Sequence, residues 1–272
     1  MERQIVTLTT DWGDFNCFVG MAKGTLYSLL PNVTVVDITH NVPLNDISQG
    51  AFIAKQACPT FPDGTIHIID IDDNDPHNLL AVKHNNQYYI CHDNGLPHLL
   101  FNDEFIEAVI LPAASQQASE DVISDNDNII PQTFRALNDM IPAVKKIVES
   151  NHLSECGAPA SEINARGQRN FVIPDENKLI GYITHIDSHG NAYSNIRYTE
   201  FLKIKKGRHF KLSVHEWDTD TLYFTFKTKN KKVNNMLLVS STGNLMLTHK
   251  SGSFAQLMNV TIDSKIEFTF SD

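Results

Sequence analysis

The opening stretch of the chain alternates strand-like and helix-like patterns, and this alternation limits the fold more than any other feature. Runs rich in β-branched residues cover residues 4–10, 33–38 and 65–71. Between them, apolar side chains recur at helical spacing over residues 17–31 and 46–57. Strands that alternate with helices pair in parallel, with helices packed on both faces of the sheet. We therefore expect an α/β fold with an N-terminal, mostly parallel sheet flanked by helices.

The segments that follow extend this predicted sheet. Two strand-like runs make up residues 79–92 around Asn85-Asn86, a dipeptide that favours a hairpin turn. Residues 107–111 have the composition of a further strand, and residues 132–150 have helical spacing. The stretch between these two, residues 112–130, is polar and poor in aromatic side chains, so we expect an excursion or flexible loop there.

The pattern changes at Lys178. From this residue onward, short strands separated by turn signals follow one another, with no convincing helix. This arrangement predicts a smaller C-terminal all-β barrel domain. Residues 151–177 are irregular and contain the crossing between domains. The predicted division is an α/β domain at 1–165, a linker at 166–177 and a β-barrel domain at 178–272.

The charge balance argues against polyanionic partners. The chain has 32 acidic and 22 basic residues, for a formal net charge of −10. Duplex nucleic acid and anionic membranes are polyanions, so we expect neither as a main partner. A cationic substrate would suit this charge, although acidic cytosolic proteins are also common. The chain shows no apolar run of membrane-spanning length and no secretory leader, and Cys17, Cys58 and Cys91 lie in apolar segments typical of reduced thiols. These features predict a cytoplasmic protein.

Two carboxylates follow strands of the predicted sheet. Asp11 comes directly after residues 4–10, and Asp72 comes directly after residues 65–71. Parallel sheets bind ligands in the crevice outside the carboxyl ends of their strands. A single Asp at such a place is often only a turn-former or a helix N-cap. Two of them on neighbouring strands, one followed by Trp-Gly, favour a ligand site.

A calcium loop is the main competing interpretation of the acidic segment after the third strand. Asp70, Asp72 and Asn74 match the first ligands of an EF-hand, but Asp75 stands where that loop needs Gly, and Ala81 stands where it needs Glu. We therefore predict no metal site here. The histidine spacings do not suit zinc hydrolysis, and neither a phosphate-binding glycine loop nor a GxSxG nucleophile motif occurs.

Six segments, taken in order across nearly the whole chain, resemble one known family. They are IVTLTTDWGDFNCFVGMAKG (5–24), VDITHNVPLNDISQGAFIA (36–54), FPDGTIHIIDID (61–72), HDNGLPHLL (92–100), IDSHGNAYSNI (186–196) and SSTGNLML (240–247). Together they resemble the S-adenosylmethionine (SAM) hydroxide adenosyltransferase family, which is related to the SAM-dependent fluorinase and chlorinase. The resemblance implies SAM or its product adenosine as ligand, with no separate cofactor. It also implies homotrimers whose sites lie between one subunit's N-terminal domain and its neighbour's C-terminal domain.

The resemblance assigns ligand contacts to three residues that match the family pattern. Asp11 would hold the ribose hydroxyls, a task that suits a carboxylate because it accepts two hydrogen bonds from a cis-diol. Asp187 would contact the methionine ammonium. Asn191 would contact adenine.

The resemblance assigns three further ligand contacts. His189 stands where the family has a Phe that stacks on adenine, and it offers a smaller flat surface. Ser241 would contact the methionine carboxyl or amine. A second adenine-stacking aromatic falls near Phe224 or Phe226, and we assign it to Phe226.

The catalytic positions depart from the family. Its hydrolases carry an Asp-Arg-His set that orients and activates water. The Asp corresponds to Asp72, the Arg position falls nearest His77, and the His position is occupied by Arg135. Two opposite changes indicate either an exchanged set, Asp72–His77–Arg135, or coincidence in a decayed site.

Three function classes follow from this resemblance. The first is hydrolysis of SAM to adenosine and L-methionine by attack of water at C5′, with His77 as base and Arg135 holding developing hydroxide. The second is a catalytically impaired protein that binds SAM or adenosine. The third is a halogenating enzyme, which the strong cation Arg135 disfavours because it would compete for the halide.

Overall fold

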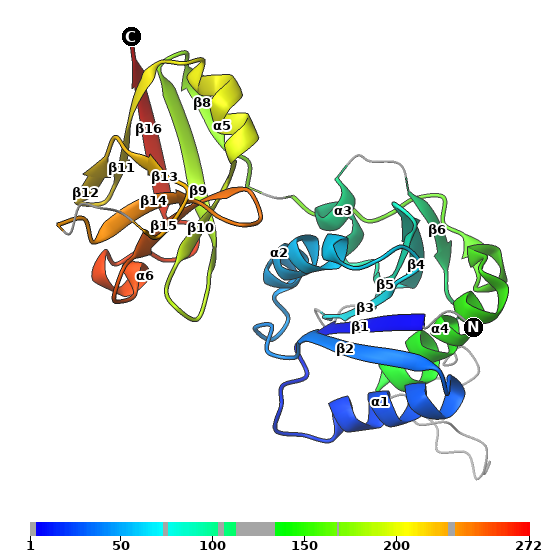
Figure 1. Cartoon of the computed structure of the whole chain (residues 1–272). Helices are drawn as coiled ribbons and strands as arrows, with labels where there is room; N and C mark the ends of the chain where they lie inside the picture. Colours follow the sequence, from blue (N-terminus) through cyan, green and yellow to red (C-terminus); the bar gives the residue numbers. More distant parts are fainter. Residues whose placement is uncertain (1–3, 73–75, 103–105, 113–133, 168, 228–231) are drawn as a thin grey trace. The chain divides into compact units, whose positions relative to one another are not determined.

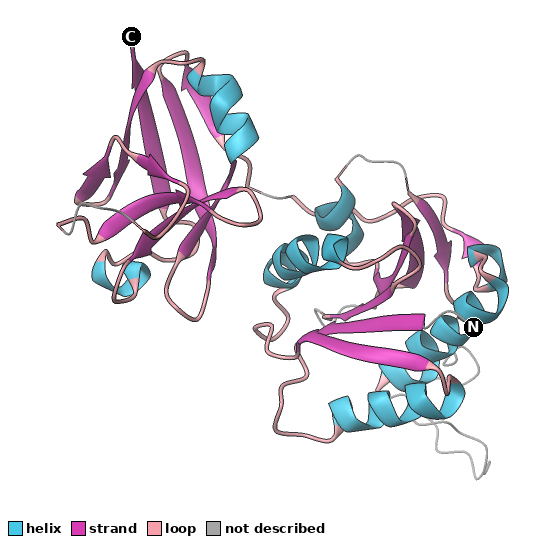
Figure 2. Cartoon of the chain, in the orientation of Figure 1, coloured by secondary structure: helices cyan, strands magenta, loops and turns pink. Residues whose placement is uncertain are grey.

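The computed structural model describes residues 4–72, 76–102, 106–112, 134–167, 169–227 and 232–272 (Figure 1). By its internal contacts the chain divides into two compact units, residues 1–167 and 168–272. The first unit is an α/β unit and the second is built mainly from strands (Figure 2). This confirms the predicted fold class, whereas the linker at 166–177 stays a prediction.

The N-terminal unit contains a seven-stranded sheet with the order β2-β1-β3-β5-β4-β6-β7. Its strands are β1 (Gln4–Thr10), β2 (Val33–Thr39), β3 (Ile66–Asp70), β4 (Leu79–His84), β5 (Gln87–His92), β6 (Glu107–Ile110) and β7 (Ala158–Pro159). The pairs β1·β2, β1·β3 and β3·β5 are parallel, and the remaining pairs are antiparallel. The predicted hairpin is confirmed as β4 and β5, with Asn85 and Asn86 both at positive φ.

Helices cover both faces of this sheet, as expected for alternating strands and helices (Figure 1). The helices are α1 (Phe18–Leu29), α2 (Ile47–Ala57), α3 (Leu96–Phe101) and α4 (Ile141–Ser150). Leu26 of α1 and Val144 of α4 share one apolar cluster with Leu8 of β1. Ala54 of α2 packs in a second cluster with Ile69 of β3. Because successive side chains of a strand point to opposite faces of the sheet, β3 contributes side chains to both cores.

The segment before α4 differs from the regular helix predicted for residues 132–150. Its described part contains a π-helical turn, Ala136–Met140, which leads into α4. Single π turns inside helices are frequent at functional sites. Most of the excursion predicted for residues 112–130 lies outside the described residues.

The C-terminal unit is a nine-stranded sheet that curls into a half-barrel (Figure 2). Its strands are β8 (Val172–Asp175), β9 (Lys178–Ile186), β10 (Ala192–Arg197), β11 (His209–Val214), β12 (Trp217–Thr219), β13 (Leu222–Tyr223), β14 (Asn235–Val239), β15 (Asn244–His249) and β16 (Lys265–Ser271). The main order is β12-β11-β16-β9-β10-β15-β14-β13, and β8 pairs with β9.

The expectation of no helix after Lys178 was wrong. The structure has α5 (Tyr198–Lys205) and α6 (Phe254–Leu257). Helix α5 buries only Phe201, so it shows no repeating apolar stripe in the sequence. Its start is fixed instead by Glu200, whose carboxylate accepts the Arg197 backbone N–H at 3.0 Å.

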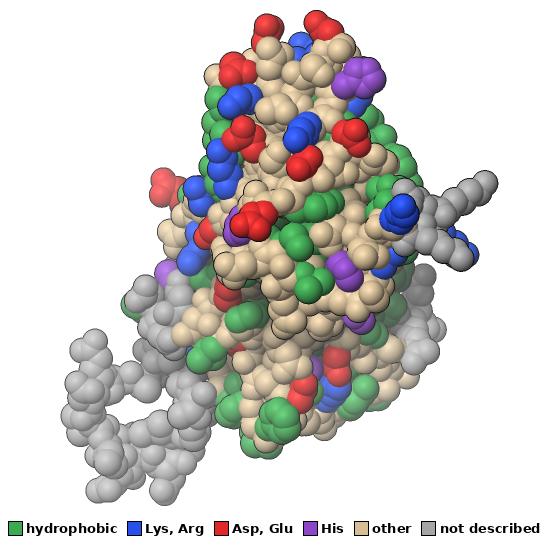
Figure 3. Space-filling model, turned by 90° about the vertical axis from the view of Figure 1, so that its left-hand side faces the viewer, with side chains coloured by type: hydrophobic (Ala, Val, Ile, Leu, Met, Phe, Trp, Pro, Cys, Tyr) green, Lys and Arg blue, Asp and Glu red, His purple; other side chains and the backbone are tan. Residues whose placement is uncertain are grey.

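The surface combines charges of both signs. On the face shown in Figure 3, Lys and Arg side chains lie among Asp and Glu side chains. Exposed pairs include Lys211–Asp218 at 3.1 Å and Lys265–Glu267 at 2.7 Å. Such exposed pairs contribute little to stability, about 0–1 kcal/mol each. None of the helices in the described ranges is long and apolar enough to cross a membrane.

Candidate functional site

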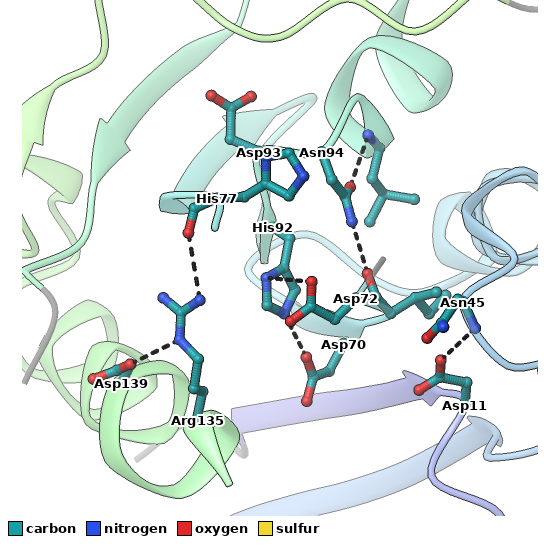
Figure 4. A network of polar contacts seen from close by, with 12 residues as sticks. Asp11, Asn45, Asp70, Asp72, His77, His92, Asp93, Asn94, Arg135 and Asp139 are labelled. Carbon is teal, nitrogen blue, oxygen red and sulfur yellow. Dashed lines mark hydrogen bonds and ion pairs between the residues drawn. The ribbon is translucent and has the colours of Figure 1, made fainter. Parts of the chain in front are cut away.

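Titratable side chains gather at the carboxyl ends of three neighbouring strands of the N-terminal unit (Figure 4). Asp11 follows β1, Asp70 ends β3, Asp72 lies two residues further on, and His92 ends β5. Because β1, β3 and β5 run parallel, their carboxyl ends meet at one edge of the sheet. The strand pairing thus accounts for the cluster, as the sequence predicted for Asp11 and Asp72.

The most buried part of this cluster is a histidine between two carboxylates. His92 is 1% exposed, and its Nε2 lies 2.7 Å from Asp70 Oδ1. The other oxygen of Asp70 accepts a hydrogen bond from Trp12 Nε1 at 2.9 Å. On the opposite edge of the ring, His92 Nδ1 lies 3.9 Å from Asp72 Oδ1.

Asp11 lies beside these carboxylates and is held by the loop before α2. Its Oδ2 accepts the Asn45 backbone N–H at 2.9 Å. Burial raises the pKa of Asp11 above its ordinary value, the Asn45 N–H opposes this, and the charges of Asp70 and Asp72 raise it further. A cationic ligand would relieve the repulsion among these three carboxylates.

Arg135 reaches the same region from the turn that precedes α4 (Figure 4). Its Nε lies 3.3 Å from Asp139 Oδ2, a carboxylate that the π-helical turn holds in the core. Its Nη1 donates to the backbone carbonyl oxygen of His77 at 3.3 Å. The guanidinium therefore bridges the start of α4 to the loop between β3 and β4.

The structure brings Asp72, His77 and Arg135 into this one neighbourhood, although the contact from Arg135 is to the His77 backbone rather than to its ring (Figure 4). The His77 ring interacts electrostatically with Asp93. Burial raises the pKa of Asp93, while the Asn164 N–H and the charge of His77 lower it. Whether these residues act in catalysis stays a prediction.

Two members of the cluster were missed by the sequence reasoning. Asp70 lies inside an apolar strand and was considered only as a calcium ligand. His92 belongs to the HDNGLPHLL segment, yet it ends a strand of six buried residues and has no motif spacing to another titratable residue. Only the strand order, which sets β5 next to β3, could have paired the two.

The C-terminal unit holds a second group of polar side chains around Asp187. Its Oδ1 accepts the backbone N–H groups of His189 and Asn191, each at 2.9 Å. Its Oδ2 accepts from Asn191 Nδ2 at 2.8 Å and from the Tyr193 hydroxyl at 3.2 Å. Burial and the Asp187 charge raise the pKa of Tyr193 to about 12. Thr248 donates to the amide oxygen of Asn191 and fixes its orientation.

Four of the five C-terminal residues assigned to the ligand line one open hollow of about 820 Å³, and they are Asp187, His189, Asn191 and Phe226. Phe226 is 55% exposed, so its ring is accessible to a flat ligand. Ser241, the fifth, is not among the lining residues. It is exposed in the turn between β14 and β15.

The first group offers several carboxylate oxygens that could accept from ammonium or hydroxyl groups. In the second group the carboxylate is that of Asp187, and each of its oxygens already accepts two hydrogen bonds. Within the described ranges, no group of three or more His, Cys, Asp or Glu side chains is arranged to hold a metal ion.

Family comparisons match both units of the chain. The model of the SAM hydroxide adenosyltransferase N-terminal domain matches residues 6–157, and that of the C-terminal domain matches residues 181–267. The chain is similar to an (R)-S-adenosyl-L-methionine hydrolase of Methanocaldococcus jannaschii, with 24% identity over 98% of this chain and 96% of the relative. It is also similar to a fluorinase of Nocardia brasiliensis, with 24% identity over 78% of each chain.

A solved structure shares the fold. The crystal structure of an uncharacterized conserved protein from Thermotoga maritima superposes with a TM-score of 0.77 at 20% sequence identity, covering 98% of this chain and 100% of that one. At this identity the likeness concerns the fold alone.

Proposed function

The chain belongs to the SAM hydroxide adenosyltransferase family, and on this premise we propose that it hydrolyses SAM to adenosine and L-methionine. One observation carries the proposal. Asp11, Asp70 and Asp72 gather at the carboxyl edge of the parallel strands, and the guanidinium of Arg135 binds the His77 carbonyl in the loop that follows Asp72. This combination supplies negative charge for a sulfonium substrate and a fixed cation for a developing hydroxide.

In the proposed reaction, water attacks C5′ of SAM in line with the C5′–S bond. A C–O bond forms, the C–S bond breaks with its electron pair passing to sulfur, and water gives up one proton. Because the sulfonium leaves as a neutral thioether, no general acid is needed at the leaving group. The protein must instead place the water and accept its proton. We assign these tasks to Asp72, His77 and Arg135.

The proposed ligand contacts divide between the two polar groups. Asp11 would accept from the ribose hydroxyls, because a carboxylate offers acceptors without a competing donor. Asp187 would accept from the methionine ammonium, while Asn191, His189 and Phe226 would bind adenine. Ser241 is exposed in the turn before β15, and we assign to it, on the family resemblance alone, a contact with the methionine carboxyl or amine.

The related hydrolases are named for the (R) epimer at sulfur, and we propose that epimer as the substrate. The test is to incubate the purified protein separately with (R)-SAM and (S)-SAM and to separate the products by chromatography. We expect adenosine and methionine from (R)-SAM, with slower release from (S)-SAM. Equal rates for the two epimers would contradict the epimer preference, and no adenosine from either would contradict hydrolysis.

A second candidate function is binding of SAM or adenosine without turnover. It is favoured by one observation, namely that Arg135 already binds Asp139 and the His77 carbonyl. In that case adenosine would stabilise the protein against heat, while SAM would remain intact after prolonged incubation. Hydrolysis predicts instead that SAM disappears.

A further inference from the structure

His92 occupies a position that the proposed reaction has not used. Its ring lies at the end of β5, is almost completely buried, and faces one carboxylate on each edge. On the Asp70 side the contact is a hydrogen bond of 2.7 Å. On the Asp72 side Nδ1 and Oδ1 are 3.9 Å apart, and among the described residues neither atom has a hydrogen-bond partner.

The hydrogen-bond requirements of these groups limit the protonation of the ring. Nε2 must carry a proton because it faces a carboxylate oxygen at hydrogen-bond distance. If the ring were neutral, Nδ1 would present a lone pair to the Asp72 oxygen, and two buried acceptors would face each other. Such unsatisfied buried groups cost free energy. An imidazolium removes the conflict because both ring nitrogens then donate.

The surroundings hold the groups on both sides of the ring in place. Asp70 is itself held by Trp12 Nε1, so the Asp70 end of the contact is rigid. The backbone at Ile71, next to Asp72, is bound by Asn94 Nδ2 at 2.9 Å. Two residues at the end of β5 therefore contact this segment, since Asn94 binds the Ile71 carbonyl before Asp72 and His92 faces the buried Oδ1 of Asp72.

Asp72 has one oxygen inside this arrangement and one outside it. Its side chain is 39% exposed, but Oδ1 is buried, so the exposed part does not include that oxygen. We propose that His92 is a positioning residue. As an imidazolium it ties Asp72 Oδ1 to Asp70, and it thereby leaves Asp72 Oδ2 directed at the attacking water. This inference rests on the proposed hydrolysis. Closing the gap requires a movement of about 1 Å, since charge-assisted bonds are about 2.7–2.9 Å long.

Two substitutions separate the two edges of the ring. The amide of His92→Asn can lie near the position of Nδ1 and keeps a donor for Asp72, whereas the longer His92→Gln places its amide near Nε2 and keeps a donor for Asp70. We expect His92→Gln to lower kcat on the order of 100-fold with KM for SAM almost unchanged, because Asp72 loses its orientation. His92→Asn should retain more of kcat. A merely structural role predicts equal kcat in the two variants, and that result would overturn the proposal.

The ring protonation gives a second readout that does not depend on turnover. In the wild-type protein labelled with ¹⁵N-histidine, we expect both ring nitrogens of His92 to be protonated at pH 7. The His92 signals are assigned as those that shift in the Asp72→Asn variant. In that variant we expect Nδ1 of His92 to be unprotonated. An unprotonated Nδ1 in the wild-type protein would overturn the proposal that His92 ties Asp72 to Asp70. Failure of the wild-type protein to release adenosine would instead contradict the proposed hydrolysis and leave this measurement intact.

Discussion

Among single residues, Asp11 makes a favourable local hydrogen bond in surroundings that disfavour its charge. It accepts the Asn45 N–H, as expected of an Asp that forms a turn. Its carboxylate is nevertheless partly buried near Asp70 and Asp72, which raises its pKa. A group whose folded-state pKa is raised in this way destabilises the fold when it is charged. We infer that the charge of Asp11 serves ligand binding and not stability.

If this inference is right, the Asp11→Asn variant should be more stable than the wild-type protein but should bind its ligand more weakly. Asp11→Asn keeps an oxygen for Asn45 and removes the charge, so we expect a higher melting temperature at pH 7 together with weaker adenosine binding. The stability gain should shrink as the pH falls through the raised pKa and vanish below 3.8, the ordinary value, where the wild-type carboxyl is protonated as well. Thermal unfolding from pH 3 to pH 8 and calorimetric titration with adenosine measure both effects. Asp14→Asn, at an exposed neighbour, is the control.

A loss of about 1.5–3 kcal/mol of adenosine binding is expected, which is the range for a hydrogen bond to a charged group. If Asp11→Asn left adenosine binding unchanged, the ribose assignment would be wrong even where hydrolysis continued.

Asp72 provides the matching test of catalysis. Asp72→Asn keeps the size of the side chain and removes the carboxylate, so we expect adenosine release to be abolished while SAM still binds. Single-turnover assays and equilibrium dialysis with SAM separate the two steps. Substantial turnover by this variant would remove Asp72 from the catalytic set.

At the scale of elements, the turn between β9 and β10 holds the Asp187 group in place. Gly190 has φ of +76°, and a Cβ there would lie 1.9 Å from Ser253 Oγ and 2.8 Å from Ser253 Cα. The turn therefore requires glycine for two reasons, its backbone conformation and the close approach of the loop before α6.

A matched pair of glycine substitutions separates these reasons. Gly243 has φ of +85°, but a Cβ there would meet only Arg197 Nη2, at 4.0 Å. Gly243→Ala should therefore lose only the conformational term of about 1–2 kcal/mol. Gly190→Ala should lose more and should also weaken adenosine binding, because residues 187–191 must shift. Denaturant unfolding of both variants tests this, and equal losses would show that the Ser253 contact is unimportant.

The strands and helices differ in how well the sequence predicted them. Strands β1, β2 and β3 were predictable because their sequences are rich in β-branched residues, and the hairpin was predictable from its Asn-Asn turn. Helix α5 was not, because a helix that buries only Phe201 leaves no periodic signal. Asp72 followed from strand position, whereas the Asp70–His92 contact required the strand order.

At the scale of the whole molecule, the family resemblance implies a homotrimer with sites shared between subunits, and we keep this as a proposal. Light scattering should then give three times the chain mass of 30.6 kDa. In such a trimer, inactive Asp72→Asn and inactive Asp187→Asn chains, unfolded together and refolded as a mixture, should regain part of the activity. Recovery requires that each site takes Asp72 from one chain and Asp187 from another. No recovery from refolded trimers would contradict shared sites.

The proposed hydrolysis requires that water attacks C5′ of the adenosyl group. Its most direct measurement is mass spectrometry of the products formed from (R)-SAM in H₂¹⁸O, with Asp72→Asn as the control. We expect adenosine that carries one ¹⁸O, unlabelled methionine, and no adenosine above background in the control. Intact SAM after incubation with the wild-type protein, or adenosine without ¹⁸O, would contradict it.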